Sequence, residues 1–120
     1  MKRNKMFELE IYRERSGKIP FIEWNLSLDT MTAAKIDARL ARFRDTGHLG
    51  KCEPVGDGVF EIKFDFGPGY RVYFGYCNKN CLMILWGGHK KTQSKDIKKA
   101  KEYWSEYLSL QGEKNEKFEL

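Results

Sequence analysis

The chain has 120 residues, of which 41% are hydrophobic and 32% charged, and its formal net charge at pH 7 is +5. This length suits one domain with a single modest core, and the hydrophobic content excludes a disordered chain. No apolar run approaches the roughly 20 residues that span a bilayer, and no signal-peptide core follows the basic start, so we expect a cytoplasmic protein without membrane contacts.

The first predicted elements are a strand and a short helix. Residues 7–12 alternate apolar and polar side chains, as a strand with one buried face does. Pro20 suits the first turn of a helix, and Phe21, Trp24 and Leu28 then recur at helical spacing.

A second helix is predicted from Asp29, which is a good N-cap residue. Its apolar stripe consists of Ala33, Ile36, Leu40 and Phe43. Three cations of this helix are expected to face solvent: Lys35, Arg39 and Arg42. The two helices should pack as a hairpin over one face of a sheet, and the glycine-rich segment 46–58 should be a loop.

Three consecutive strands are predicted next. Apolar residues occupy every second position of 60–66, and the alternation resumes at Tyr70 after a Gly-Pro-Gly break. A second turn at 78–80 leads to the run 82–86, which is apolar on both faces, as in a buried central strand. We expect this strand to end at the two glycines that follow it.

The alternation also predicts a cationic site. Lys63 and Arg71 lie on the polar side of their strands, and the segment His89-Lys90-Lys91 directly follows the last strand. If the turns are tight, these residues converge on one side of the sheet.

A third helix is predicted from Thr92 or Ser94 to about Leu108, with a tail expected to fray over 111–120. Its buried stripe would consist of Ile97, Ala100, Trp104 and Leu108. The predicted fold is therefore α+β, in the order β-α-α-β-β-β-α, with a mostly antiparallel sheet, a helical hairpin on one face and a C-terminal helix.

The three cysteines are Cys52, Cys77 and Cys81. A hairpin brings Cys77 near Cys81, but a cytoplasmic compartment argues against a lasting disulfide. The spacing matches no recognisable metal motif, so we expect structural or incidental cysteines, no metal and no cofactor.

Four motifs carry a family resemblance: S-G-K-I-P-F-I-E-W at 16–24, F-E-I-K-F at 60–64, G-P-G-Y-R-V-Y-F at 67–74 and G-G-H-K-K-T-Q-S-K-D-I at 87–97. In this order they resemble the RelE/ParE toxin superfamily of type II toxin–antitoxin modules, in particular its HigB-like, phage-derived addiction module killer proteins. The resemblance covers about residues 7 to 108. It implies a RelE-like toxin domain over 1–110.

The resemblance implies a ribosome-dependent, metal-independent mRNA endonuclease that inhibits translation and growth. Its partners would be mRNA, the ribosome and a cognate antitoxin, expected to be a small helix-turn-helix protein encoded next to it. Two alternatives stay open: a ParE-like toxin that binds DNA gyrase without cutting RNA, and a degenerate member that only binds its antitoxin. Fold alone does not choose between them.

RNA cleavage by transesterification needs a base for the 2′-hydroxyl, charge stabilisation at phosphorus and an acid for the 5′-oxygen. By resemblance, Arg71 matches an arginine that contacts the scissile phosphate, and Lys63 matches a general-base or phosphate-binding position. The functional segment after the last strand maps onto His89 and Lys90. The family commonly has an acidic residue where His89 stands.

Further residues are candidates for RNA binding: Tyr73, Lys91, Lys95 and Lys98. Tyr73 would stack on a base, and the lysines would contact phosphates. Without the resemblance, the ordinary interpretation is a solvated face for Lys63 and Arg71, a surface position for His89 and a packing role for Tyr73.

Overall fold

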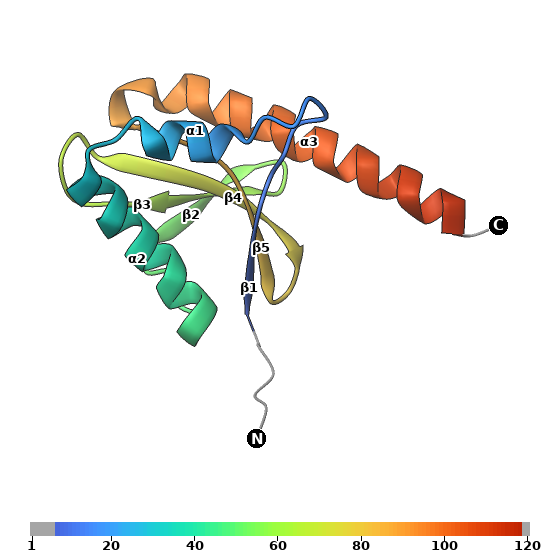
Figure 1. Cartoon of the computed structure of the whole chain (residues 1–120), viewed down its shortest axis with the longest axis horizontal. Coiled ribbons are helices and arrows are strands. Elements are labelled where there is room, and N and C mark those ends of the chain that lie inside the picture. The colour runs from blue at the N-terminus through green and yellow to red at the C-terminus, as the bar shows by residue number, and fades with distance from the viewer. Residues whose placement is uncertain (1–6, 119–120) are drawn as a thin grey trace.

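The computed structural model describes residues 7–118, with side chains described as far as Gln111. Within this part of the chain, one five-stranded sheet has the strand order β1-β5-β4-β3-β2 (Figure 1). The strands are β1 (Glu8–Ile11), β2 (Cys52–Gly56), β3 (Val59–Lys63), β4 (Tyr70–Asn78) and β5 (Cys81–His89). β1 pairs in parallel with β5 and the other neighbours are antiparallel, so the predicted α+β class and mostly antiparallel sheet are confirmed.

The helices are α1 (Pro20–Leu26), α2 (Thr30–Thr46) and α3 (Gln93–Phe118), with a 3-10 turn, η1 (Lys90–Thr92), before α3. Asp29 caps α2 as predicted, because its Oδ2 accepts a hydrogen bond of 3.1 Å from the Thr32 backbone N–H. α3 runs well past Leu108, so residues 111–118 are helical where a frayed tail was expected, and residues 119–120 lie outside the described part. Figure 1 shows the C-terminal end of α3 projecting beyond the sheet.

Helices cover both faces of the sheet, so the sheet lies between two hydrophobic cores. Residues of α1 and α2 pack on one face with alternate residues of the strands, including Ile62, Val72 and Phe74. The other face carries Tyr73 and Leu85 and is covered by α3. The predicted polar face is therefore a second buried layer over much of its area.

Two predictions about the strands were wrong. The segment predicted as a loop contains β2, which is an edge strand. An edge strand tolerates Pro54, because the side of the strand that faces away from β3 needs no backbone N–H for the sheet. β3 ends at Lys63, before the predicted Phe66.

The glycines near the end of β5 do not terminate it. The strand continues through Gly87 to His89, and a Cβ at Gly87 would lie 2.2 Å from the Trp24 ring of α1. A Cβ at Gly75 of β4 would lie 2.7 Å from the Trp104 ring of α3. These glycines mark the places where a helix approaches the sheet closely.

The predicted hairpin does bring Cys77 near Cys81, but the expectation that they form no disulfide was wrong, because the two residues form one across the turn between β4 and β5. Their Cα atoms are 5.4 Å apart, within the usual range for a disulfide. Cys52 is exposed with a free thiol. Among residues 7–118, no helix has the length and apolar composition to cross a membrane.

Candidate functional site

Three cations meet at the end of the sheet where β5 leads into η1. Lys63 and Arg71 are direct cross-strand neighbours, and Arg71 pairs in turn with Gly88. The Cβ of Lys90 and the Nη1 of Arg71 both lie against Gly69, 3.4 and 3.5 Å from where its Cβ would be. We call Lys63, Arg71 and Lys90 the cationic edge.

Arg71 is held in place by acceptors within the protein. Its side chain is only 12% exposed, and its Nε lies 3.7 Å from Oε1 of Glu61. Its Nη1 donates to the backbone carbonyls of Gly69 at 3.1 Å and Tyr70 at 3.3 Å. The sequence predicted a solvent-facing arginine, and this is wrong because α3 covers that face of the sheet.

Glu61 is a buried carboxylate that the sequence interpretation left without a role. The residue is 1% exposed, and its Oε2 accepts a hydrogen bond of 2.8 Å from Nε2 of Gln93 at the start of α3. A buried carboxylate is costly unless charges and hydrogen bonds compensate it. Glu61 therefore fixes both the arginine and the beginning of α3.

Lys63 has a carboxylate partner on β2. Its Nζ lies 2.8 Å from Oε2 of Glu53. The hydrogen bond from Lys63, followed by the charge of Lys63, lowers the pKa of Glu53 below its ordinary value. The ion pair is open to solvent, with the Lys63 side chain 21% and the Glu53 side chain 57% exposed, so a competing phosphate can displace it.

The backbone beside Lys63 is fixed by Arg39 of α2, which was expected to face solvent. The guanidinium donates to three carbonyls, those of Leu49, Lys51 and Lys63. Burial, followed by the charge of Arg42, lowers the pKa of Arg39. Arg39 joins the end of β3 to the segment before β2 and thereby positions Lys63.

Tyr73 does not face the surface. The residue is 0% exposed, and burial, followed by the charges of Glu61 and Asp96, raises the pKa of its hydroxyl. A ring without exposed area cannot stack on a base, so the predicted stacking role of Tyr73 is wrong for this structure.

His89 lies on the other face of the sheet from Arg71. Because β5 continues to His89, the register places it beside Tyr70, on the face covered by α1 and α2. Its backbone N–H donates to the Thr92 hydroxyl at 3.3 Å. The structure therefore does not bring His89 into the cationic edge, contrary to the predicted convergence.

The junction between β5 and α3 is anchored by Asp96. Its Oδ1 accepts from the indole N–H of Trp86 at 3.0 Å, and its Oδ2 accepts from the Thr92 hydroxyl. The residue is 6% exposed and lies against Gly88, where a Cβ would meet its Oδ2 at 1.8 Å. Asp96 thus sets where η1 presents Lys90 and Lys91.

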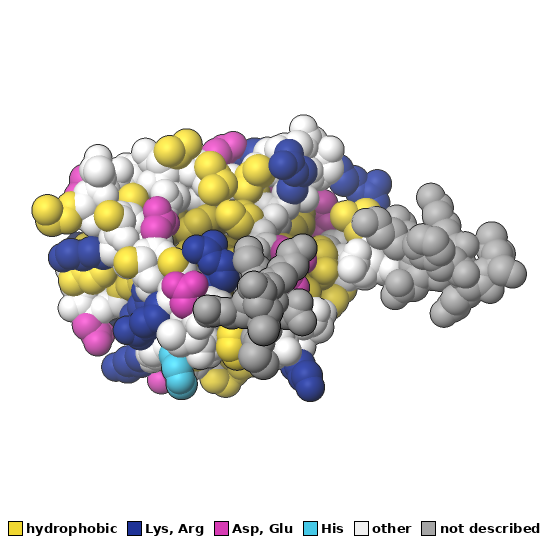
Figure 2. Space-filling view, turned by 60° about the horizontal axis from the view of Figure 1, so that its bottom comes forward, with side chains coloured by type: hydrophobic (Ala, Val, Ile, Leu, Met, Phe, Trp, Pro, Cys, Tyr) yellow, Lys and Arg dark blue, Asp and Glu magenta, His cyan; other side chains and the backbone are white. Residues whose placement is uncertain are grey.

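Three of the predicted RNA-binding lysines are exposed: Lys91, Lys95 and Lys98. Lys98 lines a shallow groove of about 600 Å³ between Arg15 and α3. Two carboxylates, Glu102 and Glu106, also line this groove, so its charge is mixed. On the face shown in Figure 2, the coloured basic side chains of the described residues lie among acidic and apolar ones without merging into one patch.

The cationic edge contains three groups that can bind phosphate, but two of them already lie beside a carboxylate of the protein. Arg71 and Lys63 are each beside a carboxylate, whereas Lys90 is exposed and has no ion-pair partner among residues 7–111. A phosphate at this edge would meet an exposed Lys90, whereas it would have to compete with Glu53 for Lys63.

The comparisons with known proteins identify a relative but no activity. No family model matches the chain. A protein of Haemophilus influenzae described as an uncharacterized protein is 44% identical over 84 residues, which cover 69% of this chain and 84% of that protein. The chain therefore belongs to the same family as this uncharacterized Haemophilus influenzae protein.

Proposed function

We propose that the protein is a toxin of a type II toxin–antitoxin module, with the RelE-like fold, and that it cleaves mRNA on the ribosome without a metal ion. The observation that carries the proposal is the cationic edge, where Lys63, Arg71 and Lys90 meet on adjacent segments. These residues lie in the motifs that resemble the RelE/ParE superfamily.

The proposed chemistry is transesterification. The 2′-oxygen attacks the adjacent phosphorus, the bond to the 5′-oxygen breaks, and the products are a 2′,3′-cyclic phosphate and a 5′-hydroxyl. Arg71 stabilises the charge that develops on the phosphorane, since its guanidinium is already oriented by Glu61. Once phosphate binding has released Lys63 from Glu53 and its ammonium has lost a proton to solvent, its amine accepts the proton of the 2′-hydroxyl, and the ammonium of Lys90 donates a proton to the departing 5′-oxygen.

His89 has no place in this chemistry while it lies on the opposite face of the sheet. The exposed lysines 91, 95 and 98 would contact ribosomal RNA phosphates. A cognate antitoxin, a small helix-turn-helix protein encoded beside the toxin, would neutralise the edge with acidic side chains in the cytoplasm.

One observation favours a second candidate, a ParE-like toxin that binds DNA gyrase or a member that only binds its antitoxin. Arg71 is 12% exposed and beside Glu61, so its guanidinium is engaged within the protein. In a protein that only binds a partner, such an arginine would stabilise the conformation of the binding surface. The pair then has a structural role and contacts no substrate.

The two candidates differ in what induction does to cells. We expect the wild-type protein to arrest growth and to produce new mRNA 5′ ends within coding regions. Lys90→Ala should reduce both effects. Lys79 is an exposed lysine next to the other end of β5, so the control variant Lys79→Ala should reduce neither effect. Intact transcripts together with trapped gyrase–DNA complexes would replace the nuclease with the second candidate.

A further inference from the structure

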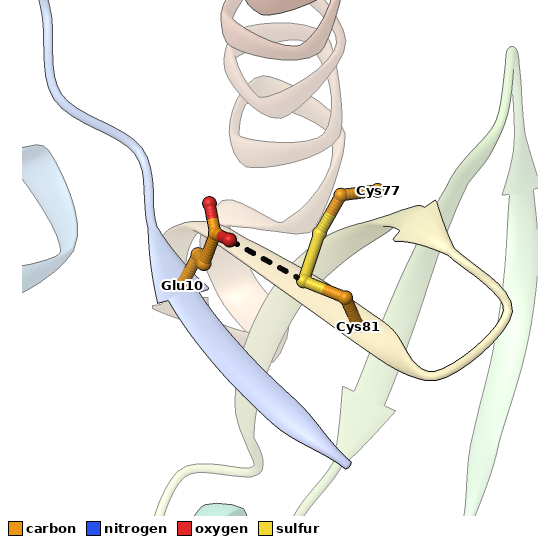
Figure 3. Close-up of side chains that lie close together, drawn as sticks. All are labelled: Glu10, Cys77 and Cys81. Carbon is orange, nitrogen blue, oxygen red and sulfur yellow. Dashed lines mark hydrogen bonds between the residues drawn. A yellow bond between two sulfur atoms is a disulfide. The ribbon is translucent and has the colours of Figure 1, made fainter. Parts of the chain in front are cut away.

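A group of possible metal ligands lies at the start of β5, at the opposite end of this strand from the cationic edge. Glu10 belongs to β1, Cys77 to β4 and Cys81 to β5, and one ligand atom from each lies within 4.8 Å of the others (Figure 3). The backbone around them is fixed, because β1 pairs with β5 and the Glu8 N–H donates to the Asn80 carbonyl at 2.9 Å.

The carboxylate of Glu10 points at the sulfur of Cys81, with 3.7 Å between Oε2 and Sγ. A disulfide sulfur carries no proton, so this contact is a hydrogen bond only when the disulfide is reduced and the Cys81 thiol donates. When both thiols lose their protons, two thiolates and a carboxylate converge. Such a group needs a cation to compensate its charge.

The spacing suits a tetrahedral zinc ion. With Zn–S near 2.3 Å and Zn–O near 2.1 Å, a sulfur and an oxygen ligand lie about 3.6 Å apart. Oε2 of Glu10 and Sγ of Cys81 already have nearly this separation. Cys77 and Cys81 need only move their sulfur atoms apart, since their backbones are joined by a hairpin turn.

We propose that the reduced protein binds one Zn²⁺ through Cys77, Cys81 and Glu10. Two thiolates select a thiophilic ion over Mg²⁺ or Ca²⁺, and three protein ligands leave the fourth position open to water. Cys81 is 1% exposed and Glu10 is exposed, so the ion enters from the side of Glu10.

The surroundings are consistent with a charged site at the edge of the second core. Cys77 packs against that core together with Tyr107 of α3. The site therefore lies between this apolar core on one side and the exposed Glu10 on the other.

The redox steps balance. A dithiol reductant gives two electrons and two protons to the Cys77–Cys81 disulfide and becomes a disulfide itself, which leaves two protein thiols. Zn²⁺ then replaces both thiol protons, which pass to solvent. The disulfide form and the zinc form are therefore alternative states of one pair of cysteines.

The test uses the full chain, reduced with a phosphine and desalted without oxygen. Titration with Co²⁺ should give one ion per chain with a thiolate-to-cobalt charge-transfer band, and Zn²⁺ should displace the cobalt. The unfolding temperature of the reduced protein should rise with added Zn²⁺, because the ion binds the folded state. The oxidised protein should bind neither ion.

Cysteine variants decide whether the three named residues form the site. Cys77→Ser and Glu10→Gln should each weaken Zn²⁺ binding by about 100-fold or more, since even outer-shell partners of a metal account for 10–100-fold. Cys52→Ser is the matched control, because its thiol is exposed on β2, and it should bind as the wild type does.

Three results would overturn the proposal: a reduced wild-type protein that binds less than one ion per chain, wild-type affinity in Cys77→Ser or Glu10→Gln, or loss of binding in Cys52→Ser. The unfolding transition of the reduced protein, recorded before metal is added, separates loss of folding from loss of binding, and Glu10→Gln changes an exposed residue. The proposal does not depend on RNA cleavage, so neither result bears on the cationic edge.

Discussion

At the scale of single residues, the Arg71–Glu61 pair decides how mutants of the cationic edge are interpreted. Arg71→Ala would leave the Glu61 carboxylate buried without its cationic partner, although Nε2 of Gln93 would still donate to it. Breaking a buried pair in this way costs about 3 kcal/mol or more. We therefore expect Arg71→Ala to lower the free energy of unfolding by about this amount, measured by urea denaturation.

A double variant separates the charge from the packing. Arg71→Met combined with Glu61→Gln removes both charges and keeps similar volumes, so it should recover most of the stability that Arg71→Ala removes. The exposed control Lys79→Ala should unfold as the wild type does. Equal stability of Arg71→Ala and the wild type would mean that Glu61 is compensated without the arginine.

Also at the residue scale, Tyr103 predicts how stability changes in alkaline solution. Burial, followed by the charge of Glu14, raises its pKa to about 12, against about 10 in an unfolded chain. Between these values the unfolded chain loses the phenolic proton while the folded protein keeps it. The free energy of unfolding therefore falls as pH rises through this window.

Tyr103→Phe tests this without changing the packing. The ring stacks on Tyr12 with 4.9 Å between centroids, and phenylalanine retains that contact. The variant should lose stability less steeply between about pH 10 and 12, measured by urea unfolding at several pH values. Identical slopes for the two proteins would show that Tyr103 ionises as readily when folded as when unfolded.

At the scale of elements, alternation and helical spacing predicted most of the fold. The pattern of 60–66 and 70–74 placed Lys63 and Arg71 on one side of the sheet, and the register shows in addition that they are direct cross-strand neighbours. Local sequence patterns did not show that α3 covers the second face of the sheet, because this depends on packing between residues that are far apart in the sequence. Arg71 was therefore assigned to a solvated face and Tyr73 to a base-stacking surface, although the structure buries Tyr73 and most of the Arg71 side chain.

Glycine was the other source of error at this scale. The same residue type breaks a strand or lets a helix approach it, and sequence alone does not distinguish the two. Because the strand was predicted to end at Gly87, His89 was assigned to the segment after β5. The alternation of the strand could then not show on which face of the sheet His89 lies. The sequence signal for the alternative is a pair of adjacent glycines, one on each face of an apolar strand, because Gly87 admits the Trp24 ring and Gly88 admits the Asp96 carboxylate.

Gly75 tests this explanation of the strand glycines. A Cβ at this position would lie 2.7 Å from three ring atoms of Trp104, so the helix or the ring must shift. We expect Gly75→Ala to lower the free energy of unfolding by about 1–3 kcal/mol, as overpacking does. Urea unfolding measures the decrease.

The matched control for Gly75→Ala is the same substitution made opposite a smaller side chain at position 104. In a Trp104→Leu background the added methyl group has room, so Gly75→Ala should cost less there than in the wild type. Equal costs in both backgrounds would place the strain elsewhere than between β4 and α3.

At the scale of the whole molecule, β5 separates two groups of different chemistry. Glu10 and the Cys77–Cys81 disulfide lie at its start, and the cationic edge lies at its end. Between them the strand is buried on both faces. Each site can therefore be changed by substitutions that leave the other and the core intact.

Lys79 and Lys90 form a matched pair for testing where RNA binds. Both are exposed lysines next to the ends of β5, but Lys90 belongs to the cationic edge and Lys79 to the opposite turn. A lysine that binds a phosphate releases counterions from the RNA, so removing this lysine makes the affinity less dependent on salt. The slope of log affinity against log salt should change by about 0.7 for each phosphate of single-stranded RNA that the variant no longer neutralises.

We expect Lys90→Ala to reduce this slope by about that amount and to weaken binding of a single-stranded RNA, measured by fluorescence anisotropy over a range of salt concentrations. Lys79→Ala should change neither. Both variants should unfold at the wild-type temperature, because neither side chain is buried. Equal effects of the two variants would mean that RNA responds only to the net charge of +5. An unchanged slope for Lys90→Ala would remove the cationic edge as the RNA-binding surface.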